Sequence, residues 1–208
     1  MLNKKKVIIA SILLVIVIGL VYVMSTAFFQ DEERTPRDAR ILKEIEGYDY
    51  TLDDTKTALF INLFDELEGV LTAEEIDEEQ YATLVAKLFI VDFFDLESKL
   101  TGNDVGGVQF VHEKAREDFI LKARDTIYKY VESDLYDDRD QKLPSVLEVT
   151  LNDIEASEFV YESIQDSNAY HANLQWQYKE DLSYQNSATL VLVREGNKLS
   201  IVELFENE

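Results

Sequence analysis

The chain contains no cysteine in its 208 residues. This excludes a disulfide-stapled fold, and it also excludes a bacterial lipoprotein anchor, which needs a cysteine at its cleavage site. Histidine is nearly as scarce, since His112 and His171 are the only two, and neither has a His or Glu four residues further on. A helical zinc motif is therefore absent. The fold must depend on an apolar core.

Basic residues are also few. The whole chain carries 20 Lys and Arg against 42 Asp and Glu, and all the acids lie after residue 30. A surface of this charge repels nucleic acids and anionic lipid headgroups, so neither is expected as a partner. It attracts cations or the basic surface of another protein.

One long apolar segment is present, at residues 7–29. It carries no charge, follows Lys4, Lys5 and Lys6, and precedes an acidic stretch at residues 31–33. A helix of this length spans about 34 Å, enough to cross a hydrocarbon core of about 30 Å. We therefore expect residues 7–29 to lie in the lipid bilayer as a single-pass transmembrane signal anchor. The flanking charges predict a cytoplasmic tail at residues 1–6 and an extracytoplasmic remainder, typical of a bacterial cell membrane protein.

A cleaved signal peptide is the alternative for this segment. The small residues Ser25, Thr26 and Ala27 would allow cleavage after Ala27. However, the apolar core continues unbroken to Val23, which is longer than the usual signal-peptide core, and Phe28 extends it beyond the cleavage point. The length favours an uncleaved anchor, and both readings stay open at this stage.

Residues 30–36 read as a linker, and residues 37–208 as an extracytoplasmic domain with a helical half at 37–134. Thr35 and Pro36 are typical of a helix start, and Gly47 of its end. Three further helices are expected. They begin near Thr51, at a capping box formed by Thr72 and Glu75, and near Val108. Residues 89–94, at the end of the third of these four helices, are apolar on all sides and must be covered by neighbours.

The period changes from helical to alternating at residues 145–205, which predicts a sheet of about four antiparallel strands. The clearest strand is 169–179, whose aromatic face contains Tyr170, Trp176 and Tyr178. Gly196 and Asn197 are typical of a two-residue hairpin turn. Helices followed by an antiparallel sheet indicate an α+β domain, with the helices packed on the aromatic face.

This order, helices and then a curved antiparallel sheet behind one N-terminal span, resembles the NTF2-like superfamily. Within that superfamily it is similar to the extracytoplasmic domain of VirB8-type proteins of secretion and conjugation systems. The strand 170–178, the polar loop 179–186 and the hairpin 188–204 carry the resemblance. It implies a nonenzymatic assembly role, or a cone-shaped pocket for a small ligand.

No motif predicts catalysis, a metal site or a cofactor. The glycine loop at 102–107 lacks the Lys-Ser/Thr of a phosphate-binding loop, and the acids at 134–140 lack the spacing of a calcium-binding loop. A Gly-x-Ser-x-Gly nucleophile turn is also absent. Asp92, inside the apolar segment 89–94, is a buried-carboxylate candidate, for which an ion pair with Lys or Arg is the simpler explanation. The chain is therefore not expected to be an enzyme.

Two functions are expected in preference to a hydrolase. The first is a protein-interaction or assembly module that a membrane anchor holds near its envelope partners, such as a component of a secretion or conjugation system. The alternative is a small-ligand-binding or sensor domain with a pocket between helices and sheet. In that case His171, Trp176 and Tyr178 are the candidate ligand-binding residues. An exposed apolar patch would favour the partner protein, and a closed apolar pocket near Trp176 the ligand.

Overall fold

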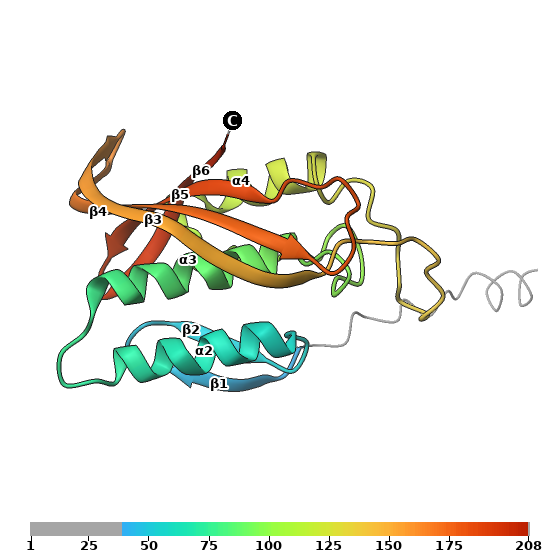
Figure 1. The fold of residues 1–208 in the computed structure, drawn as a ribbon, viewed down its shortest axis with the longest axis horizontal. Helices are drawn as coiled ribbons and strands as arrows, with labels where there is room; N and C mark the ends of the chain where they lie inside the picture. Colours follow the sequence, from blue (N-terminus) through green and yellow to red (C-terminus); the bar gives the residue numbers. More distant parts are fainter. Residues whose placement is uncertain (1–38, 208) are drawn as a thin grey trace, which may run out of the picture. The chain divides into compact units, whose positions relative to one another are not determined.

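The structure, a computed structural model, describes residues 39–207. A four-stranded antiparallel sheet of order β3-β4-β5-β6 forms its C-terminal part (Figure 1). The strands are β3 (Val146–Tyr161), β4 (Ile164–Tyr178), β5 (Ser187–Glu195) and β6 (Lys198–Glu206). Three α-helices in the described part of the chain precede the sheet, so the expected α+β class is confirmed.

The long β3–β4 hairpin supplies much of the inner face of the sheet. Ala172, Leu174 and Trp176 alternate along β4 and are buried, as the period of two predicts. The Trp176 ring lies 4.4 Å from the ring of Phe94, centroid to centroid. Register shifts in the β3–β4 pairing interrupt the ladder, and such irregularities increase twist and bend a sheet. The ribbon curls at its far end in Figure 1.

Helix α3 (Glu78–Phe94) lies between the sheet and helix α2 (Ala58–Leu71) (Figure 1). The expected all-round burial of residues 89–94 is confirmed, because α2 covers one side of α3 and the strands cover the other. This stretch is therefore core and offers no exposed patch for a partner.

Both helices begin later in the chain than expected. The side chain of Thr57 caps α2, accepting from the Phe60 amide, and Asp77 caps α3, accepting from the Gln80 amide. The prediction of a capping box at Thr72 was wrong, because the hydroxyl of Thr72 instead donates to the Glu68 carbonyl at the end of α2. Asp is at least as good an N-cap as Thr, and Asp77 stands immediately before the first residue of α3, so Asp77 caps this helix.

A β-hairpin stands where a helix was expected after Thr35. Strands β1 (Ile41–Ile45) and β2 (Tyr50–Asp53) pair antiparallel, so residues 41–53 of the expected helical half are not helical. The apolar residues of β1 are too few to separate a period of 3.6 from a period of 2. A distant contact supports the hairpin, since the Tyr50 hydroxyl donates to the Leu199 carbonyl of β6 at 2.7 Å.

The fourth expected helix begins five residues later than predicted. A 3-10 turn, η1 (Val108–Phe110), is followed by helix α4 (Glu113–Asp125). Between them Val111 forms a parallel bridge with Ile201 at the outer side of β6, so α4 starts beside that strand. The Tyr130 side chain, beyond the end of α4, is 73% exposed.

The β5–β6 turn was predicted correctly. Glu195 pairs with Lys198 across it, and Gly196 has the positive φ of 65° that this turn needs at its first central position.

None of the helices within residues 39–207 is long and apolar enough to cross a membrane. The expected tail at 1–6, the membrane segment at 7–29, the cleavage point at Ala27 and the linker at 30–36 all lie outside the described residues.

Candidate functional site

A groove of about 500 Å³ lies between α4, the end of β6 and the β3–β4 turn. We call it the α4–β6 groove. Apolar side chains from α3, α4, β3, β4 and β6, and from the segment before α4, share its lining: Phe89, Val111, Ala115, Phe119, Phe159, Ile164, Ile201, Val202, Leu204 and Phe205. The aromatic side chains of Phe205 and Tyr161 are each at least half exposed at the groove. Exposed aromatic groups beside an apolar floor are typical of a binding surface.

Helix α4 leaves this space open because it is packed loosely. Only Ala123 of its 13 residues is fully buried, and Phe119 is half-buried with its ring 5.8 Å from the Phe89 ring. Lys114 links α4 to the β3–β4 turn across one end of the groove. Its ammonium donates to the hydroxyl of Ser163 in that turn at 2.8 Å. The hairpin tip and α4 are therefore joined at one end and separated along the rest.

Strand β6 presents an open edge to the groove. It is the last strand of the sheet and pairs on one side with β5. On its other side, Ile201 bridges Val111, and the His112 amide donates to the Ile201 carbonyl. The described structure shows no strand on that side of residues 202–206. A row of unpaired backbone groups is a template for an added strand.

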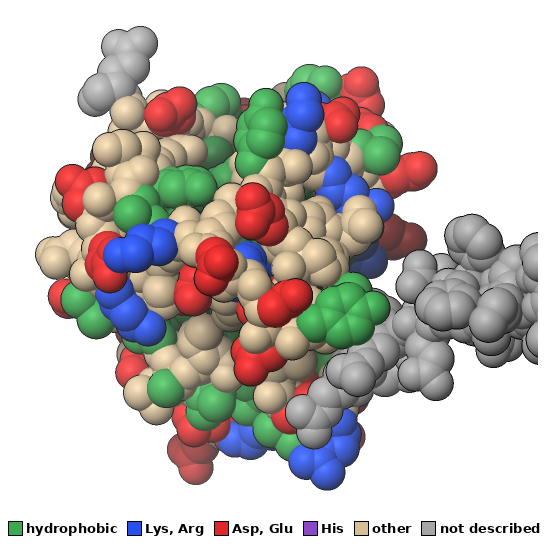
Figure 2. Space-filling model, turned by 90° about the vertical axis from the view of Figure 1, so that its right-hand side faces the viewer, with side chains coloured by type: hydrophobic (Ala, Val, Ile, Leu, Met, Phe, Trp, Pro, Cys, Tyr) green, Lys and Arg blue, Asp and Glu red, His purple; other side chains and the backbone are tan. Residues whose placement is uncertain are grey.

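The domain around the groove is strongly acidic. Residues 39–207 carry 37 Asp and Glu against 15 Lys and Arg. Figure 2 shows acidic side chains spread over one face, with Lys and Arg between them. At the groove itself the acids Asp118, Glu162 and Glu203 stand beside Lys114 and Lys122. Because Lys114 is already bound to Ser163, the groove favours a partner that brings positive charge.

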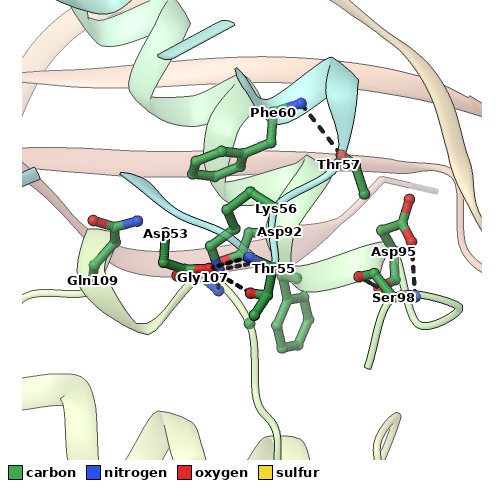
Figure 3. Close-up of polar contacts among 12 residues, drawn as sticks. Asp53, Thr55, Lys56, Thr57, Phe60, Asp92, Asp95, Ser98, Gly107 and Gln109 are labelled. Atoms are coloured by element: carbon green, nitrogen blue, oxygen red, sulfur yellow. Dashed lines mark hydrogen bonds and ion pairs between the residues drawn. The ribbon is translucent and has the colours of Figure 1, made fainter. Parts of the chain in front are cut away.

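Asp92 forms a buried ion cluster near the C-terminal end of α3 (Figure 3). Its Oδ1 lies 2.9 Å from the ammonium nitrogens of both Lys56 and Lys99, and its Oδ2 accepts from the Gly107 amide at 2.8 Å. Burial alone would raise the pKa of Asp92, but the two ammonium groups and the amide outweigh burial and hold this pKa well below its usual value.

The Asp92 carboxylate is therefore a permanent anion and cannot act as a general acid near neutral pH. The space beside the cluster is only about 20 Å³, which holds no organic ligand. The expected ion pairing of this residue is confirmed, and the cluster joins α3 to the segment before α2 and to the glycine loop.

The glycine loop at 102–107 binds this internal anion through the Gly107 amide. A Cβ on Gly106 would lie 1.9 Å from the Asp92 carbonyl oxygen, so the backbones approach too closely for any other residue. Gly106 therefore allows close backbone contact between the loop and α3.

The three sequence-derived ligand candidates do not share one surface. Trp176 and Tyr178 lie on the inner face of β4, where Trp176 is 1% exposed and packed on Phe94. His171, five residues from Trp176, points to the opposite face, and its Nε2 is buried without a hydrogen-bond partner in the described part of the chain. The two hollows of about 500 Å³ or more that we describe are lined by other residues, so ligand binding by these three stays a prediction.

The side chains of His112, Glu195 and Ser200 do converge, but not as a catalytic triad. The Ser200 hydroxyl donates to Glu195 Oε2 at 2.7 Å, and His112 Nε2 lies 3.8 Å from Glu195 Oε1. A nucleophilic serine needs the histidine between itself and the acid. Here the acid is in the middle and Ser200 is fully buried, so this arrangement does not activate a nucleophile.

The acids at 134–140 are organised around an arginine. The guanidinium of Arg139 donates to the carbonyls of Lys99 and Glu97 and lies 3.6 Å from Asp134 Oδ2. Within residues 39–207, no group of three or more His, Asp or Glu side chains is placed to hold a metal ion.

Sequence reasoning missed the α4–β6 groove. Its lining comes from four segments that are distant in the chain, and the extra residue in β6 near Val202, where the β5–β6 register shifts, leaves no sequence signal. A comparison of the chain with protein-family models, curated proteins and solved structures found no match.

Proposed function

We propose that this chain is a membrane-anchored, extracytoplasmic interaction module that binds an extended segment of a partner protein in the α4–β6 groove. The observation that carries the proposal is the juxtaposition of an apolar groove with the open edge of β6. An added strand would gain main-chain hydrogen bonds from the edge and would place alternate side chains on the apolar floor.

The charge of the domain narrows the choice of partner. A segment with apolar side chains at alternate positions and flanking Lys or Arg would complement Asp118, Glu162 and Glu203. The apolar run at residues 7–29 supports a location at the membrane, and tethering there would raise the effective concentration of a membrane-bound partner. The resemblance to NTF2-like, VirB8-type domains supports the same assembly role.

A small amphipathic ligand is the second candidate for the same groove. Its volume of about 500 Å³ falls within the range of roughly 300–1,000 Å³ that pockets for organic ligands occupy. The groove is open along β6 and its lining is partly charged, which favours the extended segment over a buried small molecule.

Site-specific photocrosslinking in native membranes tests the proposal. A photoreactive phenylalanine analogue at Tyr161 or Phe205 would sample the groove, and the same analogue at Tyr130, exposed beyond α4, is the matched control. We expect both groove positions to capture the same partner segment, of alternating apolar pattern, and Tyr130 to capture none.

Two results would contradict binding of an extended partner segment in the α4–β6 groove. Equal capture of that segment at Tyr130 would place the partner elsewhere. A small-molecule adduct at both groove positions, with no protein adduct, would select the second candidate.

A further inference from the structure

A second hollow, of about 580 Å³, opens between the β1–β2 turn, the start of α4 and the β5–β6 turn. We call it the Arg116 hollow. Seven residues from these three regions and from η1 line it: Asp49, Val108, Gln109, Glu113, Arg116, Glu195 and Lys198. Nothing in the proposed function uses this surface.

Two cations in this hollow, Arg116 and Lys198, form no direct ion pair with an acid in the described part of the chain. Arg116 Nη2 donates to the Val111 carbonyl at 3.3 Å, whereas its Nε is buried without a hydrogen-bond partner in residues 39–207. The ammonium of Lys198 donates to the Asp49 carbonyl at 3.1 Å and lies 4.7 Å from the centre of the Tyr50 ring. In the described part of the chain, neither cation lies within 4.0 Å of a carboxylate oxygen.

This is unusual because acids outnumber bases so heavily in the domain. The nearest candidate, Glu195, is occupied elsewhere: its Oε1 accepts from the Glu113 amide and its Oε2 from the Ser200 hydroxyl. The side chains of Asp49 and Glu113 are exposed at the rim. The acids of the hollow therefore act on Arg116 and Lys198 from a distance and form no direct ion pair with either cation.

The pKa of Lys198 is lowered, and burial is the main cause. Asp49 and Glu195 oppose this shift, whereas the Arg116 guanidinium adds to it, with an effect smaller than that of Asp49. An anion bound beside Lys198 would favour its charged form and so oppose the effect of burial.

We propose that Arg116 and Lys198 form a binding site for the phosphate or carboxylate group of a small anionic ligand. The planar guanidinium offers paired N–H donors for an oxyanion, and the ammonium adds a point charge. The wall is rigid, because the Gln109 side chain accepts from the Thr51 amide at 2.8 Å and donates to the Thr51 carbonyl at 3.1 Å. The remaining volume leaves room for the rest of the ligand.

The negative charge of the domain sets the conditions for binding. It repels anions at long range, and salt at about 0.1 M limits this repulsion to about 10 Å while leaving close contacts largely intact. Binding should therefore be measured near that ionic strength with a weakly competing salt.

The test uses the full-length chain in a neutral detergent, labelled with 15N-arginine and titrated separately with inorganic phosphate and with acetate. The Arg116 Nε–H resonance is identified by its loss in Arg116→Lys. We expect this resonance to shift and saturate with phosphate, with acetate, or with both, and the stronger of the two identifies the group preferred.

The variant Lys198→Met should weaken the affinity by about tenfold or more, as expected when one charge-assisted hydrogen bond is lost. The control Lys179→Met removes the same charge from an exposed residue and should leave the affinity within about twofold. The proposal is overturned if the Arg116 resonance does not saturate with either anion at millimolar concentrations. It is also overturned if both Lys variants weaken binding equally, since the effect would then be one of net charge.

Discussion

The Lys99 ammonium and the Asp92 carboxylate lie 2.9 Å apart, with both side chains buried, at the point where α3 ends against the glycine loop. Removal of one partner leaves an uncompensated buried charge. We expect Lys99→Met to lower the free energy of unfolding by about 2–4 kcal/mol, because Lys56 still pairs with Asp92 and limits the loss. Urea unfolding measures this change.

The matched control for that variant is Lys142→Met. Lys142 pairs with Glu180 at 3.0 Å, but both side chains are largely exposed, and such pairs contribute about 0–1 kcal/mol. Equal losses for the two variants would show that the Asp92 cluster has no special structural role.

Acid should remove the contribution of Asp92 to stability. The folded pKa of Asp92 is lowered below its unfolded value of about 3.9, so this contribution is complete above that pH and is lost as the pH falls towards the folded pKa. Between pH 6 and pH 3, the stability difference between the wild type and Asp92→Asn should narrow by about 1 kcal/mol. A difference that stays constant over this range would show that the carboxylate is not held ionised.

Two glycines should respond in opposite ways to alanine. Gly106→Ala would place a Cβ 1.9 Å from the Asp92 carbonyl oxygen. We expect it to lower the free energy of unfolding by several kcal/mol, which is on the order of the total stability of a domain. Gly69→Ala, on the exposed side of α2 with no atom within 4 Å, should stabilise by about 0.5–1 kcal/mol. Thermal unfolding of both variants checks the pair, and a tolerated Gly106→Ala would refute the close approach of the loop.

A charge placed in the α4–β6 groove should block the partner without unfolding the domain. Phe205 is 50% exposed, so Phe205→Glu should change the free energy of unfolding by only about 0.5 kcal/mol. The same variant should abolish photocrosslinking from Tyr161, because the apolar floor is interrupted. Tyr130→Glu makes an equivalent change outside the groove and should leave crosslinking intact; the reverse pattern would contradict the proposed site.

Elements with a long, regular pattern were predictable from the sequence. The alternating pattern of β4 specifies both the strand and the burial of Trp176. The same holds for Gly196, which specifies the β5–β6 turn, and for the end of α3, which is apolar on all sides and buried. The β1–β2 hairpin was not predictable, because its short pattern fits either period and a contact between Tyr50 and Leu199, 149 residues apart, supports it.

The two hollows depend on relationships that no local pattern contains. Arg116 and Lys198 come together only because η1 and α4 dock beside β6, and their lack of a direct ion pair in the described part of the chain is a property of the folded surface. The ion pairing of Asp92 was an exception. A single acid in an apolar segment needs a positively charged partner, so an ion pair was predictable from the sequence, although its partners Lys56 and Lys99 were not.

The absence of cysteine makes cysteine labelling the most direct test of the central claim, that the groove is outside the membrane and occupied by a partner. Single variants Phe205→Cys, in the groove, and Lys179→Cys, at an exposed control position, would be treated with a membrane-impermeant maleimide in intact cells and after purification. We expect both variants to react rapidly when purified, and we expect that in cells Lys179→Cys still reacts while Phe205→Cys is protected. Lack of reaction at both positions in intact cells, or equal reaction at both, would contradict the central claim.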